Sequence, residues 1–195
     1  MRLFVSIDLP KQVCEVVAEA QRYLKGKNLL EGSFSNPTHA HLTLAFLGDV
    51  DEEKFAAIDT ALCKIEMPSY AAHLGSLGYF ERGDQVSVMY LSVVCSELVS
   101  LAQRVQAVVA SVLPGFNPDQ RSFQPHITLA RVKRSEDASP KKLKAKTGDE
   151  KLRKEIVGYH VPSIEFTIDQ FMLKESVLTS EGPVHTVRAT YPCSQ

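Results

Sequence analysis

The chain has 195 residues, of which 44% are apolar and 23% charged, an ordinary composition for one folded domain or two small lobes. Its formal net charge is −1, so the overall charge gives no argument for nucleic-acid binding, which a strongly basic domain would give. No stretch approaches the roughly 20 apolar residues that span a bilayer, which argues against a membrane-spanning protein.

The predicted elements of the first half of the chain alternate between strands and helices. Alternating apolar and polar residues indicate strands, and apolar residues at three- and four-residue spacing indicate amphipathic helices. Pro10 ends the first strand, and Gly26 is the expected stop of the first helix. In chain order we predict a strand at 3–7, a helix at 13–24, a turn-rich stretch at 32–37, a strand at 41–47 and a helix at 51–64.

The second half begins with a predicted hairpin, whose turn is Arg82-Gly83-Asp84. The elements that follow are mostly strands. The whole order therefore suits an α+β protein better than a doubly wound parallel sheet. We predict strands at 70–80 and 86–94, a helix at 98–109, and strands at 126–132, 163–173 and 184–189.

The cysteines and the N-terminus give an expectation about the compartment. No two cysteines form a C-x-x-C pair, so neither a zinc framework nor a thioredoxin-like motif is indicated. The apolar stretch at the N-terminus is too short for a signal peptide. We therefore expect a cytoplasmic monomer with free thiols and no contact with membranes. The four cysteines are Cys14, Cys63, Cys95 and Cys193.

One basic segment differs from the rest of the chain. Between Arg131 and Lys154 there are ten basic and four acidic residues, which leaves a formal charge of −7 elsewhere. Large apolar residues are nearly absent before Leu152, so we predict that 133–158 is a flexible insertion with a short helix at its end. Two interpretations remain open for it, a solvated loop without function and a positive surface that steers phosphate.

The strongest signal is a duplicated motif. His41-Leu42-Thr43-Leu44-Ala45-Phe46 and His126-Ile127-Thr128-Leu129-Ala130-Arg131 are nearly identical and start 85 residues apart. Residues two apart in a strand share a face, so each segment places its histidine and threonine together and its aliphatic residues on the other side. A single His-x-Thr in a strand is usually structural, but its duplication favours a functional site.

Two such strands that face each other suit phosphoryl displacement without a metal cofactor. One imidazole can remove a proton from the incoming nucleophile, and the other can protonate the departing oxygen on the opposite side. The two hydroxyls can bind phosphoryl oxygens. The pattern therefore predicts paired acid and base catalysis by His41 and His126, assisted by Thr43 and Thr128.

These residues resemble the motifs of a known family. The two His-x-Thr segments are similar to those of the 2H phosphoesterases, and among these most similar to the RNA 2′,3′-cyclic phosphodiesterases, also described as 2′-5′ RNA ligases. The resemblance extends to the N-terminal strand, to the Phe-Leu-Gly after the first motif and to Leu173-Lys174-Glu175-Ser176. It covers nearly the whole chain apart from about residues 133–158.

The resemblance implies a fold and an activity. The fold would be a single domain over 1–195 with two pseudo-symmetric lobes, each with an antiparallel sheet and helices, and a cleft between them. The activity would be metal-independent hydrolysis of a 2′,3′-cyclic phosphate, on RNA termini or small nucleotides, to a 2′-phosphate. Some members also show weak 2′-5′ ligation.

The resemblance also implies roles for particular residues. His41 would donate the proton to the leaving 3′ oxygen, and His126 would accept one from water. Thr43, Thr128 and Arg131 would bind the phosphate, although strict alternation places Arg131 on the face opposite Thr128 unless a bulge redirects it. Candidates for base stacking are Phe46, Tyr79 and Phe80, each of which is otherwise a core aromatic. The other histidines, at 39, 73, 160 and 185, are expected to be structural or on the surface.

Two alternatives stay open. A nucleotide-binding or scaffolding module would keep the fold and the cleft without turnover. A 2′-5′ oligonucleotide phosphodiesterase would use the same residues on another substrate. Two intact motifs favour an enzyme, because binding alone does not need paired proton-transfer groups.

Overall fold

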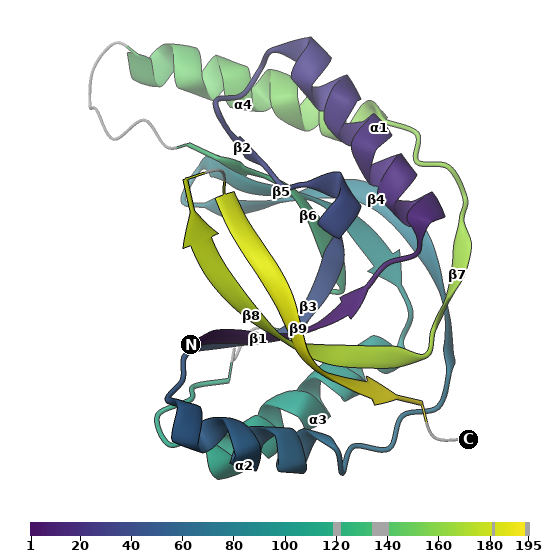
Figure 1. Cartoon of the computed structure of the whole chain (residues 1–195). Helices are drawn as coiled ribbons and strands as arrows, with labels where there is room; N and C mark the ends of the chain where they lie inside the picture. The colour runs from purple at the N-terminus through teal and green to yellow at the C-terminus, as the bar shows by residue number, and fades with distance from the viewer. Residues whose placement is uncertain (119–121, 134–140, 181, 194–195) are drawn as a thin grey trace.

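The structure, a computed structural model, describes residues 1–118, 122–133, 141–180 and 182–193. They form an α+β fold, as the sequence predicts, with four α-helices and a curled antiparallel sheet of nine strands (Figure 1). The helices are α1 (Lys11–Lys27), α2 (Glu52–Leu62), α3 (Glu97–Val112) and α4 (Lys141–Gly158), with a short 3-10 helix η1 (Pro37–His39). The strands are β1 (Arg2–Asp8), β2 (Gly32–Phe34), β3 (His41–Asp49), β4 (Tyr70–Arg82), β5 (Gln85–Val94), β6 (His126–Val132), β7 (Glu165–Ile168), β8 (Gln170–Thr179) and β9 (Gly182–Pro192).

The sheet has two halves that meet at β3 and β6. Its strand order is β7-β4-β5-β6-β3-β1-β8-β9, and β2 pairs with β6. Within the described residues a single pair, Leu42 with Ile127, joins β3 to β6. We call β1, β3, β8 and β9 with α2 and α3 the His41 half, and β2, β4 to β7 with α1 and α4 the His126 half. In Figure 1, α2 and α3 lie at one end of the molecule and α1 and α4 at the other.

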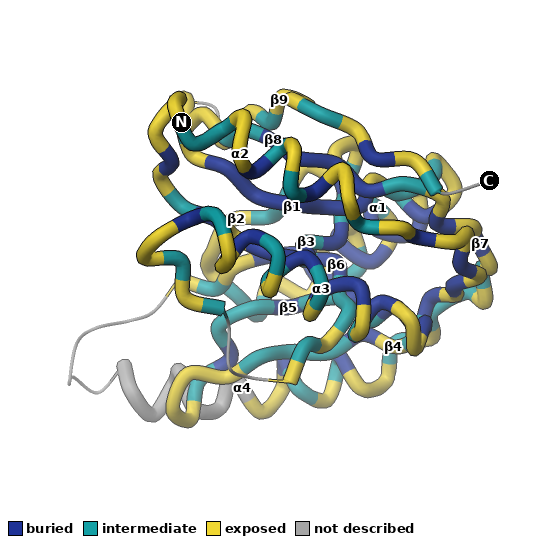
Figure 2. Tube along the Cα trace, turned by 90° about the horizontal axis from the view of Figure 1, so that it is seen from below, coloured by how far each residue is buried: buried dark blue, intermediate teal, exposed yellow. Residues whose placement is uncertain are grey.

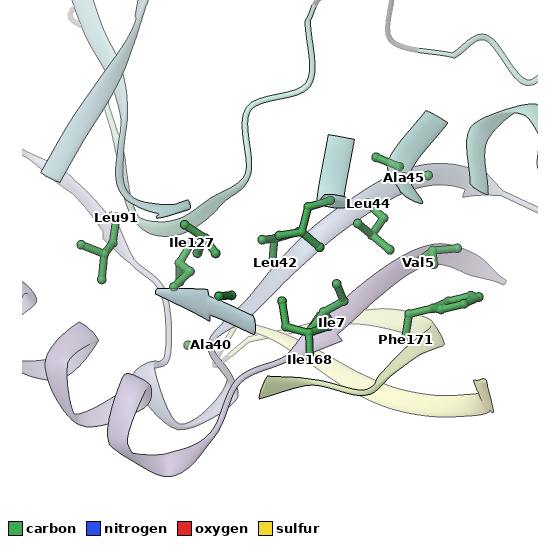
Figure 3. Close-up of a cluster of buried hydrophobic side chains, with 14 of the residues drawn as sticks. Val5, Ile7, Ala40, Leu42, Leu44, Ala45, Leu91, Ile127, Ile168 and Phe171 are labelled. Carbon is green, nitrogen blue, oxygen red and sulfur yellow. The ribbon is translucent and has the colours of Figure 1, made fainter. Parts of the chain in front are cut away.

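The two halves share one hydrophobic core. Leu42 and Ile127 are fully buried at the junction, where they belong to a continuous cluster of apolar side chains (Figure 3). Strand β1 lies between β3 and β8, so it is buried along nearly its whole length and appears mostly dark blue in Figure 2. The junction therefore fixes the two halves relative to each other by packing as well as by main-chain pairing.

Three local features differ from the sequence prediction. The expected strand at 163–173 is two strands, because β7 pairs with β4 in one half and β8 pairs with β1 in the other, so the chain changes partner at Asp169. Helix α1 passes Gly26 and ends at Lys27, followed by Asn28 in the left-handed conformation (φ 50°) that often terminates helices. The turn-rich stretch contains the short strand β2.

The basic segment also differs from its prediction. We predicted a flexible insertion over 133–158 with a short helix, and the structure has α4 over 18 of these residues. Leu152 and Ile156 are each 1% exposed and belong to the core, and Arg153 forms an ion pair with Glu81 at 2.8 Å. The last turns of α4 are thus part of the fold. Residues 134–140 lie outside the described part of the chain, so the prediction made for them stays a prediction.

Candidate active site

The two motif strands are related by a local two-fold axis. Leu42 and Ile127, the second residues of the two motifs, pair with each other in antiparallel strands. An antiparallel register pairs residues symmetrically about such a point, so His41 lies on the side of Thr128, and Thr43 lies on the side of His126. All four side chains are half-buried, whereas their neighbours in the strands are buried. The fold therefore gathers both predicted pairs on one face of the sheet.

Both imidazoles are held in the same way. His41 Nδ1 lies 2.9 Å from the His39 carbonyl oxygen, and His126 Nδ1 lies 2.7 Å from the Gln124 carbonyl oxygen. A carbonyl only accepts, so each Nδ1 carries the proton and donates it. Each neutral ring then presents the lone pair of Nε2 to the site, and each protonated ring presents an Nε2–H. Either histidine is thus placed to act as an acid or as a base.

The His41 ring lies among groups from three strands. Its centroid is 5.3 Å from that of Phe4 in β1 and 5.3 Å from that of His185 in β9, the latter at an interplanar angle of 85°. The same side of the sheet carries Lys174 of β8, which is 6% exposed and forms an ion pair with Asp8. We expected His185 to be structural or on the surface, and the structure instead places it in direct ring contact with His41.

The His126 ring lies in an aromatic corner. Phe80 of β4 packs edge-on against it, with centroids 5.0 Å apart and an interplanar angle of 86°. Tyr90 of β5 is 5.5 Å away and contacts Phe80 as well, at 4.4 Å. Phe80 is thus beside the site, and its role in base stacking stays a prediction. Tyr79 is not, because it pairs with buried Met89 on the other face, where Arg153 of α4 lies over its ring at 5.9 Å.

A bulge in β6 brings Arg131 to the same face as Thr128. Tyr90 pairs with Thr128 and the next residue of β5, Met89, pairs with Ala130, so Leu129 is an extra residue in β6. Val88 then pairs with Arg131. Side chains of paired residues point to the same face, and Val88 and Tyr90 are two apart, so Arg131 shares the face of Thr128.

Strand β3 has the equivalent bulge. Ser6 pairs with Thr43 and Val5 with Ala45, so Leu44 is the extra residue, and Phe4 pairs with Phe46. The two motifs accordingly have the same order of buried and exposed positions through their sixth residue, which is Phe46 in one and Arg131 in the other. Phe46 is 65% exposed, with its ring centroid 6.1 Å from that of Phe4. Phe46 therefore shares the face of Thr43 and is exposed there.

The histidines of the site are shifted toward their neutral forms. Burial lowers the pKa of His41, and the charge of Lys174 lowers it further against the opposing effects of the His39 carbonyl and Asp8. Burial also lowers the pKa of His126, and the charge of Arg131 acts in the same direction. Burial lowers the pKa of His185 to about 4, with His41 and Lys174 contributing. The positive surroundings suit an anionic ligand.

The sequence prediction therefore missed some members of this face. His185 and Tyr90 have no motif, and Lys174 and Asp8 are a lone basic and a lone acidic residue in strands. Lys174 follows directly after the predicted strand at 163–173, and its sequence signal was its place in the Leu173-Lys174-Glu175-Ser176 segment of the family resemblance. His73 and His160 are exposed, as expected, and His39 contributes its main-chain carbonyl rather than its ring.

Several features are absent from the described part of the chain. No three His, Cys, Asp or Glu side chains gather as a metal ion would need within these residues. None of the helices seen there is long and apolar enough to cross a membrane. All four cysteines are free thiols, and burial raises the pKa of two of them, Cys14 and Cys95.

Comparison with known proteins identifies relatives over nearly the whole chain. Residues 9–176 match the model of the 2′-5′ RNA ligase superfamily. The chain is 31% identical to the RNA 2′,3′-cyclic phosphodiesterase of Thermotoga maritima, covering 99% of this chain and 95% of the relative. It is 30% identical to the protein of that name from Methanocaldococcus jannaschii, covering 96% and 98%. The crystal structure of apo Escherichia coli LigT aligns with a TM-score of 0.73 at 25% identity, covering 100% of this chain and 98% of LigT.

Proposed function

The chain belongs to the 2′-5′ RNA ligase superfamily, and on this premise we propose that it is a phosphodiesterase that hydrolyses 2′,3′-cyclic phosphates on RNA termini or nucleotides. The observation that carries the proposal is the local two-fold axis between the motifs, which gathers two histidines with the same ring orientation and two threonines on one face. The expected resemblance to the cyclic phosphodiesterases is confirmed by the named relatives.

The proposed step is an in-line displacement at phosphorus. His126 Nε2 removes a proton from water as its oxygen attacks, and the bond from phosphorus to the 3′ oxygen breaks. His41 Nε2–H gives its proton to that departing oxygen. The product carries a 2′-phosphate and a free 3′ hydroxyl. His41 ends neutral and His126 protonated, so one proton exchange with solvent at each ring restores the starting state.

Phosphate binding is assigned to the groups beside the two rings. We assign to the hydroxyls of Thr43 and Thr128 the donation of hydrogen bonds to the non-bridging oxygens as negative charge builds on them. Arg131 shares the face of Thr128 and supplies a permanent positive charge. Lys174 already has Asp8 as its partner, so we assign it the local positive field rather than a direct bond to phosphate.

Base recognition is assigned to two of the three predicted aromatics. Phe46 is exposed on the face of Thr43, and Phe80 lies against His126. A planar base stacks on an exposed aromatic ring without strong sequence preference. Tyr79 is left out because the sheet separates it from the site.

The function is tested by product analysis. The substrates are the four nucleoside 2′,3′-cyclic monophosphates and an RNA that ends in a cyclic phosphate, with EDTA present throughout. We expect turnover and a 2′-phosphate, whose position NMR identifies. A 3′-phosphate product would contradict the role given to His41. Absence of turnover together with nucleotide binding would replace the enzyme with a binding module.

We further propose a cytoplasmic monomer. The support for the compartment is the set of four free cysteines, which suits a reducing environment. Size-exclusion chromatography with light scattering is expected to give the mass of a single chain, 21.6 kDa, and a dimer mass would contradict the proposal.

A further inference from the structure

A glutamine side chain from a helix contacts each bulge in the motif strands. Gln106 Nε2, from α3, lies 3.2 Å from the carbonyl oxygen of Leu44, the extra residue of the β3 bulge. Gln21 Nε2, from α1, lies 3.0 Å from the carbonyl oxygen of Leu129, the extra residue of the β6 bulge. The two helices belong to different halves, so the local two-fold axis extends to these amides.

We propose that Gln21 and Gln106 are positioning residues that hold the two bulges and thereby direct Arg131 and Phe46 into the site. The inference rests on the proposed function for what Arg131 and Phe46 do there. It goes beyond that function by assigning to Gln21 and Gln106 the task of holding the sixth residue of each motif, Arg131 in one and Phe46 in the other, on the face of the site.

The physical reason lies in the effect of a bulge on side-chain direction. In a regular strand the sixth residue of the motif would point to the face opposite the histidine, because the strand period is two. One extra residue reverses every later side chain. An extra residue also takes a carbonyl out of the regular ladder, and a buried carbonyl without a donor is costly, so an amide placed to donate to it stabilises the bulged register.

The two glutamines differ in how firmly they are fixed. Gln21 is 3% exposed, and its amide nitrogen also lies 2.9 Å from the Ser35 carbonyl oxygen and 3.1 Å from Ser35 Oγ. The Leu129 carbonyl has a second donor in the Ser35 main-chain N–H, at 3.0 Å. Gln106 is half-buried, and among the described residues the Leu44 carbonyl is the one hydrogen-bond partner of its side chain. Loss of Gln106 is therefore expected to disturb its bulge more than loss of Gln21.

Double-mutant cycles on the full chain test this coupling. One cycle combines Gln106→Leu with Phe46→Ala and the other combines Gln21→Leu with Arg131→Ala. Two quantities are measured for each protein, kcat/KM for the nucleoside 2′,3′-cyclic monophosphates and the Kd for adenosine 2′-monophosphate. Circular dichroism and thermal unfolding show that each variant folds.

We expect Gln106→Leu to lower kcat/KM about tenfold, the effect of one lost hydrogen bond. In the Phe46→Ala background the same change should cost less than about twofold, because its target is gone. The discrimination among the four bases should weaken in the Gln106 variant.

The Gln21→Leu change should lower kcat/KM by a smaller factor, which is equal for all four bases. This loss of kcat/KM should disappear in the Arg131→Ala background. The crossed pairs, Gln106 with Arg131 and Gln21 with Phe46, should be additive.

Matched controls come from the same helices. Gln12→Leu removes an exposed amide of α1 that donates to the Glu165 carbonyl, and Gln103→Leu removes an exposed amide of α3. Both should leave activity and binding unchanged.

Additive cycles in an active, folded protein would overturn the inference and leave the proposed function standing. A wild-type protein that neither turns over nor binds would overturn the proposed function itself.

Discussion

At the scale of single residues, the ring orientation of the two histidines determines what they can do. Each Nδ1 donates to a main-chain carbonyl two residues earlier in its own chain segment, so each motif sets its own tautomer. No other side chain is needed to fix the tautomer of either histidine. In the proposed mechanism, where the substrate places its leaving oxygen therefore decides which ring is the acid and which the base.

Replacing either histidine should remove turnover and leave the fold intact. His41→Ala and His126→Ala are each expected to lower kcat by about 10²–10⁴-fold, the usual contribution of a positioned acid or base. The measurement is steady-state hydrolysis, with circular dichroism for folding. His73→Ala is the matched control, because His73 is exposed on β4 away from the site. A near-normal rate in either site variant would exclude the two-histidine mechanism.

The pH dependence follows from the direction of the two pKa shifts. The proposed mechanism needs one histidine protonated and one neutral, so kcat/KM is expected to be bell-shaped in pH. Burial lowers the pKa of both His41 and His126 from 6.5. The free protein therefore loses its proton donor at a lower pH than ordinary histidines would, and the maximum of kcat/KM should lie below pH 6.5. A maximum above pH 7 would contradict the lowered pKa values of the two histidines.

His185 should make the fold sensitive to acid. Its pKa is about 4 in the folded chain against 6.5 for an ordinary histidine, so the unfolded chain binds more protons between these values. The contribution of neutral His185 to the free energy of unfolding is complete above pH 6.5 and is lost as the pH falls to about 4. Urea unfolding between pH 4 and 7 should show a smaller pH dependence for His185→Phe than for wild type. His160→Phe, at an exposed position, should behave like wild type.

At the scale of elements, local pattern predicted the helices and strands well but not their irregularities. The periodicity of α1 and α3 was sufficient to find them, because each helix buries one face. The apolar-polar alternation was also sufficient to find β1, although this strand is buried on both faces. The bulges at Leu44 and Leu129 left no signal, since both motifs read as regular alternation over their first four residues. A bulge is a property of two paired strands, which one segment cannot reveal.

Helix α4 shows the same limit for composition. Its charged sequence predicted a flexible insertion with a short helix at its end, yet Ile156 is 1% exposed and packs in the core. Ile156→Ala should lower the free energy of unfolding by about 2–5 kcal/mol. The neighbouring Val157 is 79% exposed, so Val157→Ala should change it by less than about 0.5 kcal/mol. Equal effects of the two substitutions in urea titrations would show that this end of α4 is not packed.

At the scale of the whole molecule, charge is separated along the chain. The segment from Arg131 to Lys154 has a formal charge of +6, and the remainder has −7. A polyanion is therefore attracted more strongly to this segment than to the remainder of the chain taken together, and the segment begins at Arg131, on the face of the site.

This separation predicts a salt effect that depends on substrate length. For an RNA that ends in a cyclic phosphate, KM should rise steeply between 50 and 200 mM salt, because several phosphates release counterions on binding. For a nucleoside 2′,3′-cyclic monophosphate the rise should be small, since one charge is involved. Steady-state kinetics at fixed pH in both salt concentrations give the comparison. The same weak salt effect on both substrates would mean that the basic segment does not contact RNA.

The sequence by itself determined the fold class, the two His-x-Thr motifs and the family resemblance, because these depend on periodicity within a segment and on a repeated motif. Only the tertiary structure decided that Arg131 and Phe46 face the site, that Tyr79 does not, and that His185 contacts His41. These facts depend on which strand pairs with which residue of its neighbour. The register comes from packing over the whole sheet, and one extra residue in a strand reverses the face of every residue beyond it.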